Sequence, residues 1–350
     1  MTRGGPTLSG RVATAVPLSP VVAWTFECSG PVSAEAAIVD DRVFIGTDAG
    51  TFYSLALDSG RELWHLETGD AISSAPAVSG AFVYVTSNDG RLYALDAETG
   101  AEVWRFEIED KISAGAVVID SRTGEGEWVM VNGYDGITRV FDAVDGRIVW
   151  TYQTDDYING APALVDDRYV VFGGCDAQLH VVNVADGSAV RTILTDAYIP
   201  ASIATFGSMA YCSNYANQTV AFDIAGGTIA WVYEDRNLLF GASPGVDEQH
   251  VYMGSRDRQL HAIDRETGKG AWKFQTGGRV ESSPLVFSNG VVFGSADGRL
   301  YAADREDGGE IWRLDLGESL IASPAFGQGR IVVGGQNGTV FAVRASVQTE

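Results

Sequence analysis

The chain has 350 residues, of which 45% are apolar and 20% are charged, and its 46 acidic residues against 24 basic ones give a formal net charge of −22. The apolar content supports a packed core rather than a disordered chain. The negative charge makes nucleic acid and anionic membranes poor partners. We expect no transmembrane segment, because no run of 18 apolar residues occurs, and three widely spaced cysteines form neither a disulfide framework nor a zinc motif.

Residues 1–20 precede the first repeat unit, and we expect them to form a flexible N-terminal extension. They lack the basic and apolar regions of an export signal, which on sequence alone predicts a cytoplasmic protein. We expect residues 21–345 to form one domain and residues 346–350 to form a C-terminal tail.

A repeat organises the rest of the chain. Seven of the eight tryptophans fall in one phase, and an arginine stands at the missing position. These sites are Trp24, Trp64, Trp104, Trp150, Arg191, Trp231, Trp272 and Trp312. Their intervals are 40, 40, 46, 41, 40, 41 and 40 residues, a period typical of solenoids and propellers.

Each unit predicts four short strands, A to D, in the same order. In the second unit an Ala-Pro stretch at 73–78 precedes a β-branched run at 82–87, and a DG turn leads to LYALD at 92–96. A D-x-x-x-G turn then leads to the strand with the tryptophan. Alternating side chains and glycine turns are typical of strands, and no sustained helical periodicity occurs. The sequence therefore predicts an all-β propeller with four-stranded blades.

The two chain ends are expected to complete one blade. The last unit, at 335–346, stops after strand C, whereas Trp24 lies in a D-type strand with no A, B or C strand before it. Pairing between these ends gives eight blades, closes the ring and leaves no spare edge strand.

The docking pattern A-x-D-x-x-T-G-x-x-x-W is carried in the second unit by Ala94, Asp96, Thr99, Gly100 and Trp104. It resembles the tryptophan-docking repeat of PQQ-type quinoprotein propellers, which the non-catalytic BamB-like propellers of bacterial envelopes share. The resemblance covers residues 21–345. We therefore assign the seven in-phase tryptophans to packing between blades, and the glycine four residues before each to a turn with positive φ.

The resemblance implies two functions from different classes. The favoured one is a monomeric, non-catalytic scaffold that binds a protein partner, similar to BamB-like assembly factors, with no cofactor, no metal and a location in the cell envelope or periplasm. The alternative is a quinoprotein dehydrogenase that uses PQQ and Ca²⁺. The chain is short for such enzymes and lacks the adjacent cysteines that many of them carry. A sensor that binds a small ligand in the central channel is a third possibility.

Departures from the repeat mark the candidate site. The B–C turns and D–A connections lie on one face of a propeller, here called the top face, and those of blades three to six are irregular. Aromatic and arginine side chains with polar neighbours are typical of binding surfaces. The candidate partner- or ligand-binding residues are Tyr134, Asp135, Tyr157, Asn159, Asp176, Tyr198, Tyr215, Asn217, Arg236, Phe240, Arg256 and Asp257. The alternative interpretation is that some of these aromatic residues fill the channel or hold loops in place.

Other residues are weaker candidates for a functional role. In the dehydrogenase alternative, Asp135, Asp176 and Asp257 would supply part of a calcium site. We expect His180 and His261 to be packing residues, since other units have tyrosine there. Trp128, the out-of-phase tryptophan, is expected on the opposite face as a second contact point.

Overall fold

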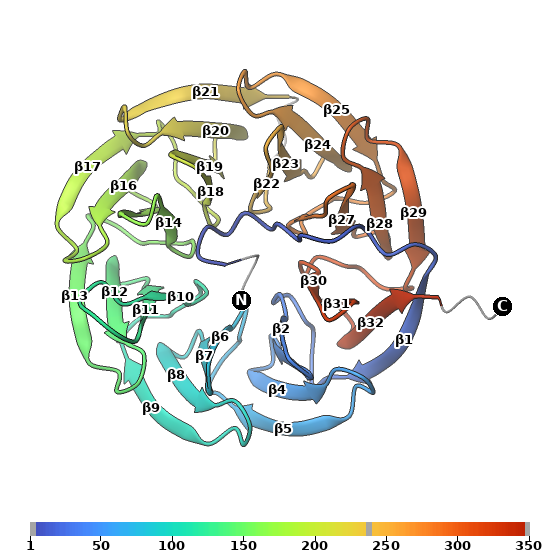
Figure 1. Cartoon of the computed structure of the whole chain (residues 1–350), viewed down its shortest axis with the longest axis horizontal. Helices are drawn as coiled ribbons and strands as arrows, with labels where there is room; N and C mark the ends of the chain where they lie inside the picture. Colours follow the sequence, from blue (N-terminus) through green and yellow to red (C-terminus); the bar gives the residue numbers. More distant parts are fainter. Residues whose placement is uncertain (1–4, 236–239, 347–350) are drawn as a thin grey trace.

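The computed structural model describes residues 5–235 and 240–346, and these form 32 strands in eight four-stranded antiparallel sheets. The sheets are arranged as blades around a central channel (Figure 1). Blade 1 contains β2 to β5, the next six blades follow in order, and blade 8 contains β30 to β32 with β1. The all-β, eight-bladed prediction is confirmed. The described residues contain no helix long and apolar enough to cross a membrane.

The A strands lie nearest the channel and the D strands lie at the rim. The A strands are β2 (Ala37–Val39), β6 (Ala77–Ser79), β10 (Val117–Asp120), β14 (Ala163–Val165), β18 (Ala204–Phe206), β22 (Gly245–Val246), β26 (Leu285–Val286) and β30 (Ala325–Gly327). The B strands are β3 (Arg42–Gly46), β7 (Phe82–Thr86), β11 (Glu127–Asn132), β15 (Tyr169–Gly173), β19 (Met209–Ser213), β23 (His250–Gly254), β27 (Gly290–Gly294) and β31 (Arg330–Gly334). The C strands are β4 (Thr51–Ala56), β8 (Arg91–Asp96), β12 (Ile137–Asp142), β16 (Gln178–Asn183), β20 (Gln218–Asp223), β24 (Gln259–Asp264), β28 (Arg299–Asp304) and β32 (Thr339–Ala345). The D strands are β5 (Glu62–Glu67), β9 (Glu102–Glu107), β13 (Ile148–Gln153), β17 (Ala189–Leu194), β21 (Thr228–Glu234), β25 (Gly270–Gln275), β29 (Glu310–Asp315) and β1 (Pro20–Glu27).

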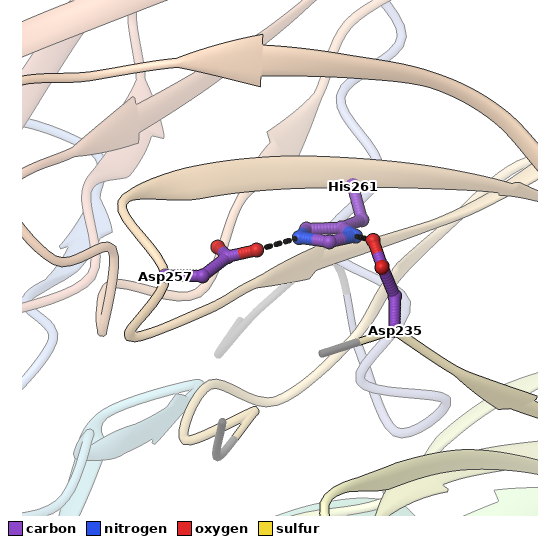
Figure 2. Close-up of side chains that lie close together, drawn as sticks. All are labelled: Asp235, Asp257 and His261. Carbon is purple, nitrogen blue, oxygen red and sulfur yellow. Dashed lines mark hydrogen bonds and ion pairs between the residues drawn. The ribbon is translucent and has the colours of Figure 1, made fainter. Parts of the chain in front are cut away.

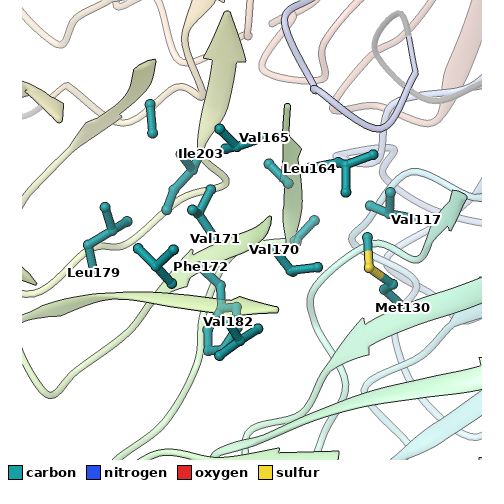
Figure 3. Packing of buried hydrophobic residues seen from close by; sticks show 14 of the residues in the cluster. Val117, Met130, Leu164, Val165, Val170, Val171, Phe172, Leu179, Val182 and Ile203 are labelled. Atoms are coloured by element: carbon teal, nitrogen blue, oxygen red, sulfur yellow. The ribbon is translucent and has the colours of Figure 1, made fainter. Parts of the chain in front are cut away.

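The core lies between the blades, because each sheet buries both of its faces against its neighbours. The B and C strands are therefore almost continuously buried, whereas D strands such as β9 alternate partly buried and exposed residues. Figure 3 shows one apolar cluster, in which Val117 and Met130 of blade 3 and Val170 of blade 4 take part. Trp128 belongs to the same cluster and is buried, so the expectation that it forms a second contact point is wrong.

The ring closes between the chain ends as predicted. Strand β1 pairs antiparallel with β32, and Trp24 lies opposite Ala342. All four strands of blade 8 are thereby hydrogen-bonded although they come from opposite ends of the chain.

Each docking tryptophan joins its blade to the next one. Trp104 lies opposite Ala94 at a β-bulge, and its indole N–H donates to the carbonyl of Ala143 in blade 3 (3.1 Å). Gly146 of that blade has φ +71°, and a Cβ there would lie 2.7 Å from the Trp104 ring, so glycine is required. The indoles of Trp24, Trp64, Trp150, Trp231, Trp272 and Trp312 donate in the same way to the carbonyls of Leu57, Ala97, Val184, Arg265, Arg305 and Pro17.

Arg191 keeps this contact in the blade that has no docking tryptophan. Its guanidinium donates to the carbonyl of Ala225 at 2.9 Å, and its side chain lies against Gly227. An arginine therefore replaces both the indole donor and its contact with the turn glycine.

The N-terminal extension is not a free tail. Leu8 and Val16 are buried, and residues 6–10 run across the unpaired edges of four A strands. The carbonyls of Pro6, Thr7, Ser9 and Gly10 accept N–H groups of Leu164, Thr205, Val246 and Val286, which hold the same position in blades 4 to 7. Unpaired edge N–H groups favour such acceptors, so the expectation of a flexible extension is wrong for residues 5–19.

Candidate partner-binding face

The B–C turns and D–A connections form one hydrogen-bonded face. Each connection lies beside B–C turns, as where Cys175 N–H donates to the Tyr157 carbonyl at 2.8 Å and Tyr215 N–H donates to the Tyr198 carbonyl at 2.9 Å. These backbone bonds fix the loops that carry the candidate tyrosines. This favours binding, because loops that are already ordered lose little conformational entropy when a partner binds.

Four tyrosines of blades 3 to 5 gather on this face, and we call Tyr134, Tyr157, Tyr198 and Tyr215 the tyrosine patch. Tyr134 and Tyr157 stack with ring centroids 5.4 Å apart, and the ammonium of Lys111 lies 4.0 Å from the Tyr134 ring centroid. Tyr157, Tyr198 and Tyr215 are 50%, 49% and 56% exposed. Large aromatic side chains left in water beside fixed loops are a candidate contact surface for another molecule.

The three candidate aspartates instead brace their own turns. Asp176 bonds His180 at 2.6 Å, Asp257 bonds His261 at 3.0 Å, and Asp135 forms a two-pronged ion pair with Arg139. Asp89 with Tyr93 and Asp297 with Tyr301 repeat this spacing of four residues in the regular blades. Burial, together with the hydrogen bond to Asp89, raises the pKa of Tyr93 to about 12 and keeps its hydroxyl a donor. The aspartates therefore act within their own turns.

The two histidines are buried among their neighbours. His180 is buried and stacks on Phe172 with centroids 5.4 Å apart. His261 is fully buried, and Figure 2 shows its ring between the carboxylates of Asp257 and Asp235.

Asp235, Asp257 and His261 form the one group of three acidic or histidine side chains in the described ranges whose ligand atoms lie within 4.8 Å of one another. The Lys273 ammonium pairs with Asp235, and the Tyr233 hydroxyl lies 3.1 Å from His261 Nδ1. These ion pairs and hydrogen bonds join blade 5 to blade 6. Sequence reasoning missed Asp235, which comes from the preceding blade, and Lys273, which lies opposite His261 in the pairing of β24 with β25.

The remaining candidates have separate environments. Phe240 is fully buried and packs edge-on against His261, so its placement on the binding face is wrong. Asn159 is partly buried and donates to Cys175 Sγ and to the carbonyl of Ile199. Asn217 has φ +65° at a position where most blades have glycine. Arg256 is exposed and bonds Glu281, and Arg236 lies outside the described residues.

The central channel holds a cavity of about 190 Å³ lined mainly by serine and alanine. Serine hydroxyls join neighbouring blades, as where Ser283 Oγ accepts the N–H of Ser243 and Ser323 Oγ accepts the N–H of Ser283, both at 3.0 Å. Leu8 of the N-terminal extension also lines the cavity, and Glu35 contributes the charged group among its lining residues.

The eight blades and their docking tryptophans define a propeller of the tryptophan-docking type. The family model described as outer membrane protein assembly factor BamB matches residues 9–118, 55–196, 135–239 and 216–347. The chain therefore belongs to the BamB-type family of PQQ-like propellers.

Solved structures agree with the fold. BamB from Moraxella catarrhalis is 22% identical, with a TM-score of 0.77 over 95% of this chain and 99% of that one. Quinohemoprotein alcohol dehydrogenase from Comamonas testosteroni is 14% identical, with a TM-score of 0.82 over 100% of this chain and 81% of that one. Because the same architecture serves both proteins, these likenesses establish the fold alone.

Curated relatives match only one part of the chain. Quinoprotein ethanol dehydrogenase from Pseudomonas aeruginosa is 30% identical over 67 residues, which are 19% of this chain and 11% of that protein. Quinoprotein alcohol dehydrogenase PedE from Pseudomonas putida is 31% identical with the same coverage. The chain thus spans about a tenth of the length of these relatives.

Proposed function

We propose that this propeller is a non-catalytic scaffold that binds a protein partner through the tyrosine patch. The observation that carries the proposal is the exposure of Tyr157, Tyr198 and Tyr215 on loops fixed by backbone hydrogen bonds. Tyrosine offers a large apolar ring and a polar hydroxyl at little cost in side-chain entropy, which is why it is enriched at interfaces. The solved BamB neighbour and the family description support the same class of function.

The family description also supports a location. Its members are described as outer membrane protein assembly factors, and a scaffold of that kind acts in the cell envelope. We therefore favour the envelope over the cytoplasmic location that the start of the sequence predicts.

The dehydrogenase alternative keeps some support from the quinoprotein relatives, but the residues present fit PQQ poorly. PQQ carries three carboxylates, whereas the described residues that line the channel cavity are mainly serine and alanine, with Glu35 as their charged side chain and no basic one among them. Asp135, Asp176 and Asp257 are held by side chains of their own turns, which leaves no converging oxygen set for Ca²⁺ among them.

Affinity capture tests the scaffold proposal. Extracts of the source cells are passed over the immobilised protein and over the double variant Tyr157→Ala/Tyr215→Ala, with Val144→Ala as control because Val144 is equally exposed in a C–D turn on the opposite face. The proposal predicts a partner retained by the wild type and by the control and lost from the double variant. Equal capture by all three folded proteins would remove the tyrosine patch from the proposal.

A calorimetric titration with PQQ in the presence of Ca²⁺ tests the alternative. The scaffold proposal predicts no saturable binding. One-to-one binding would favour the dehydrogenase and would direct the search to alcohol or sugar oxidation.

A further inference from the structure

A second feature of the top face lies on blades 6 and 7, away from the tyrosine patch. Arg256, Arg258 and Arg279 line an open hollow of about 390 Å³ together with Gly277, Gly278 and Ala296. We call it the arginine hollow. It concentrates three guanidinium groups in a chain whose acidic residues outnumber its basic ones by 46 to 24.

This hollow forms where the sequence departs from the repeat in two ways: an acidic residue is replaced by glycine, and a glycine is replaced by arginine. Gly278 lies in the D–A connection between β25 and β26, at a register where four other connections carry an acid. Those acids are Asp70, Asp110, Asp156 and Glu318. Arg258 lies at a B–C turn register where five other blades carry glycine, namely Gly50, Gly90, Gly136, Gly298 and Gly338. Carboxylates are thus lost and a guanidinium is gained at one place.

Two of the arginines are held in position by one shared carboxylate. Arg256 and Arg279 are each bonded through Nε to a different oxygen of the largely buried Glu281, at 2.8 and 2.6 Å, while their side chains stay 52% and 54% exposed. A guanidinium has five N–H donors, so these contacts leave the terminal nitrogens available for an acceptor in the hollow. Bracing by Glu281 reduces the side-chain entropy that ligand binding would remove.

The third arginine, Arg258, occupies a position where the backbone conformation favours glycine. Arg258 has φ +68°, a left-handed conformation that residues other than glycine and asparagine adopt rarely. Its guanidinium makes no ion pair within the described part of the chain, whereas one carboxylate, Glu281, is shared by the other two arginines. Asp297, whose Oδ2 accepts the N–H of Gly277 at 2.7 Å, also lies at the edge of the hollow. The three guanidinium groups therefore outnumber these two carboxylates, Glu281 and Asp297.

We propose that the arginine hollow is a binding site for the phosphate group of a small soluble ligand. Planar guanidinium groups offer paired donors that match the geometry and charge of phosphate oxygens. The site is separate from the tyrosine patch, so its failure would leave the scaffold proposal untouched.

Calorimetric titration with inorganic phosphate, at constant ionic strength set by sodium chloride, tests this site. We expect saturable binding to the wild type and about tenfold weaker binding to Arg258→Gly, since one charge-assisted contact is lost. Ala177→Gly is the matched control, because Ala177 holds the same turn register in blade 4 with φ +56° and carries no charge. It should bind phosphate as the wild type does.

Thermal unfolding gives an independent readout. In phosphate-free buffer Arg258→Gly should be at least as stable as the wild type, because glycine relieves the left-handed strain, yet it should lose the rise in midpoint that phosphate gives the wild type. Arg256→Gln/Arg279→Gln should also lose that rise. The proposal is overturned if the wild type shows no saturable binding, or if Arg258→Gly and the double variant bind phosphate as the wild type does.

Discussion

Gly100 offers a test of blade docking that changes no tryptophan. An alanine there would keep a left-handed φ of +75°, and its Cβ would lie 2.6 Å from Cδ2 of the Trp64 indole in the preceding blade. Gly80 is the matched control, since its φ is +54° and a Cβ there would meet no atom within 4 Å. Both substitutions therefore incur the backbone cost, and only Gly100→Ala also disturbs the docking contact.

The backbone cost for alanine is about 1–2 kcal/mol, partly offset by about 0.4–1 kcal/mol because alanine restricts the unfolded chain. Forcing the indole of Trp64 to shift adds about 1–3 kcal/mol, the usual cost of overpacking. Urea unfolding followed by tryptophan fluorescence should thus show Gly100→Ala less stable than Gly80→Ala by about 1–3 kcal/mol. Equal losses of unfolding free energy would refute the docking argument.

Three further variants or measurements follow from the packing. Leu8→Ala should lower the free energy of unfolding by about 2–4 kcal/mol in urea, because Leu8 is buried in the channel; no loss would mean that the N-terminal extension is not docked. Arg191→Met should cost about 1 kcal/mol by removing its hydrogen bond to the next blade, and an unchanged urea midpoint would contradict this role. Burial raises the pKa of Cys28 and of Cys212 to about 12, so at pH 8 both thiols stay protonated in the native protein and should react with an aromatic disulfide reagent only after unfolding. Because unfolded thiols ionise at a lower pH than these folded ones, stability should fall as pH rises above about 9.

The sequence predicted the blades because their signal is repeated eight times. The spacing from Trp64 to Trp104 sets both the length of a blade and the partner of each indole. The β-bulge before each tryptophan was not foreseen, since it depends on pairing register, as where Ala94 faces Trp104 but Leu95 faces Glu102.

The candidate site was less predictable because exposure depends on register within the loops. Phe240 occupies the buried position held by Ile72 in blade 2, and this alignment would have excluded it from the binding face. The pairing of Asp176 with His180 also had a signal, because Asp89 and Tyr93 show the same spacing of four.

The N-terminal extension carried no such signal. Its backbone carbonyls, such as that of Pro6, accept edge N–H groups whatever the side chain, so no residue pattern marks the contact. Asp235 joins His261 only through the arrangement of blades 5 and 6, which a search along the chain cannot reveal.

The scaffold account is tested most directly by the dissociation constants of the captured partner for the wild type and for Tyr157→Ala/Tyr215→Ala. Two interface tyrosines contributing about 3 kcal/mol together predict about a hundredfold weaker binding by the double variant, with an unchanged melting temperature. A ratio near one between equally stable proteins would contradict the assignment of partner binding to the tyrosine patch.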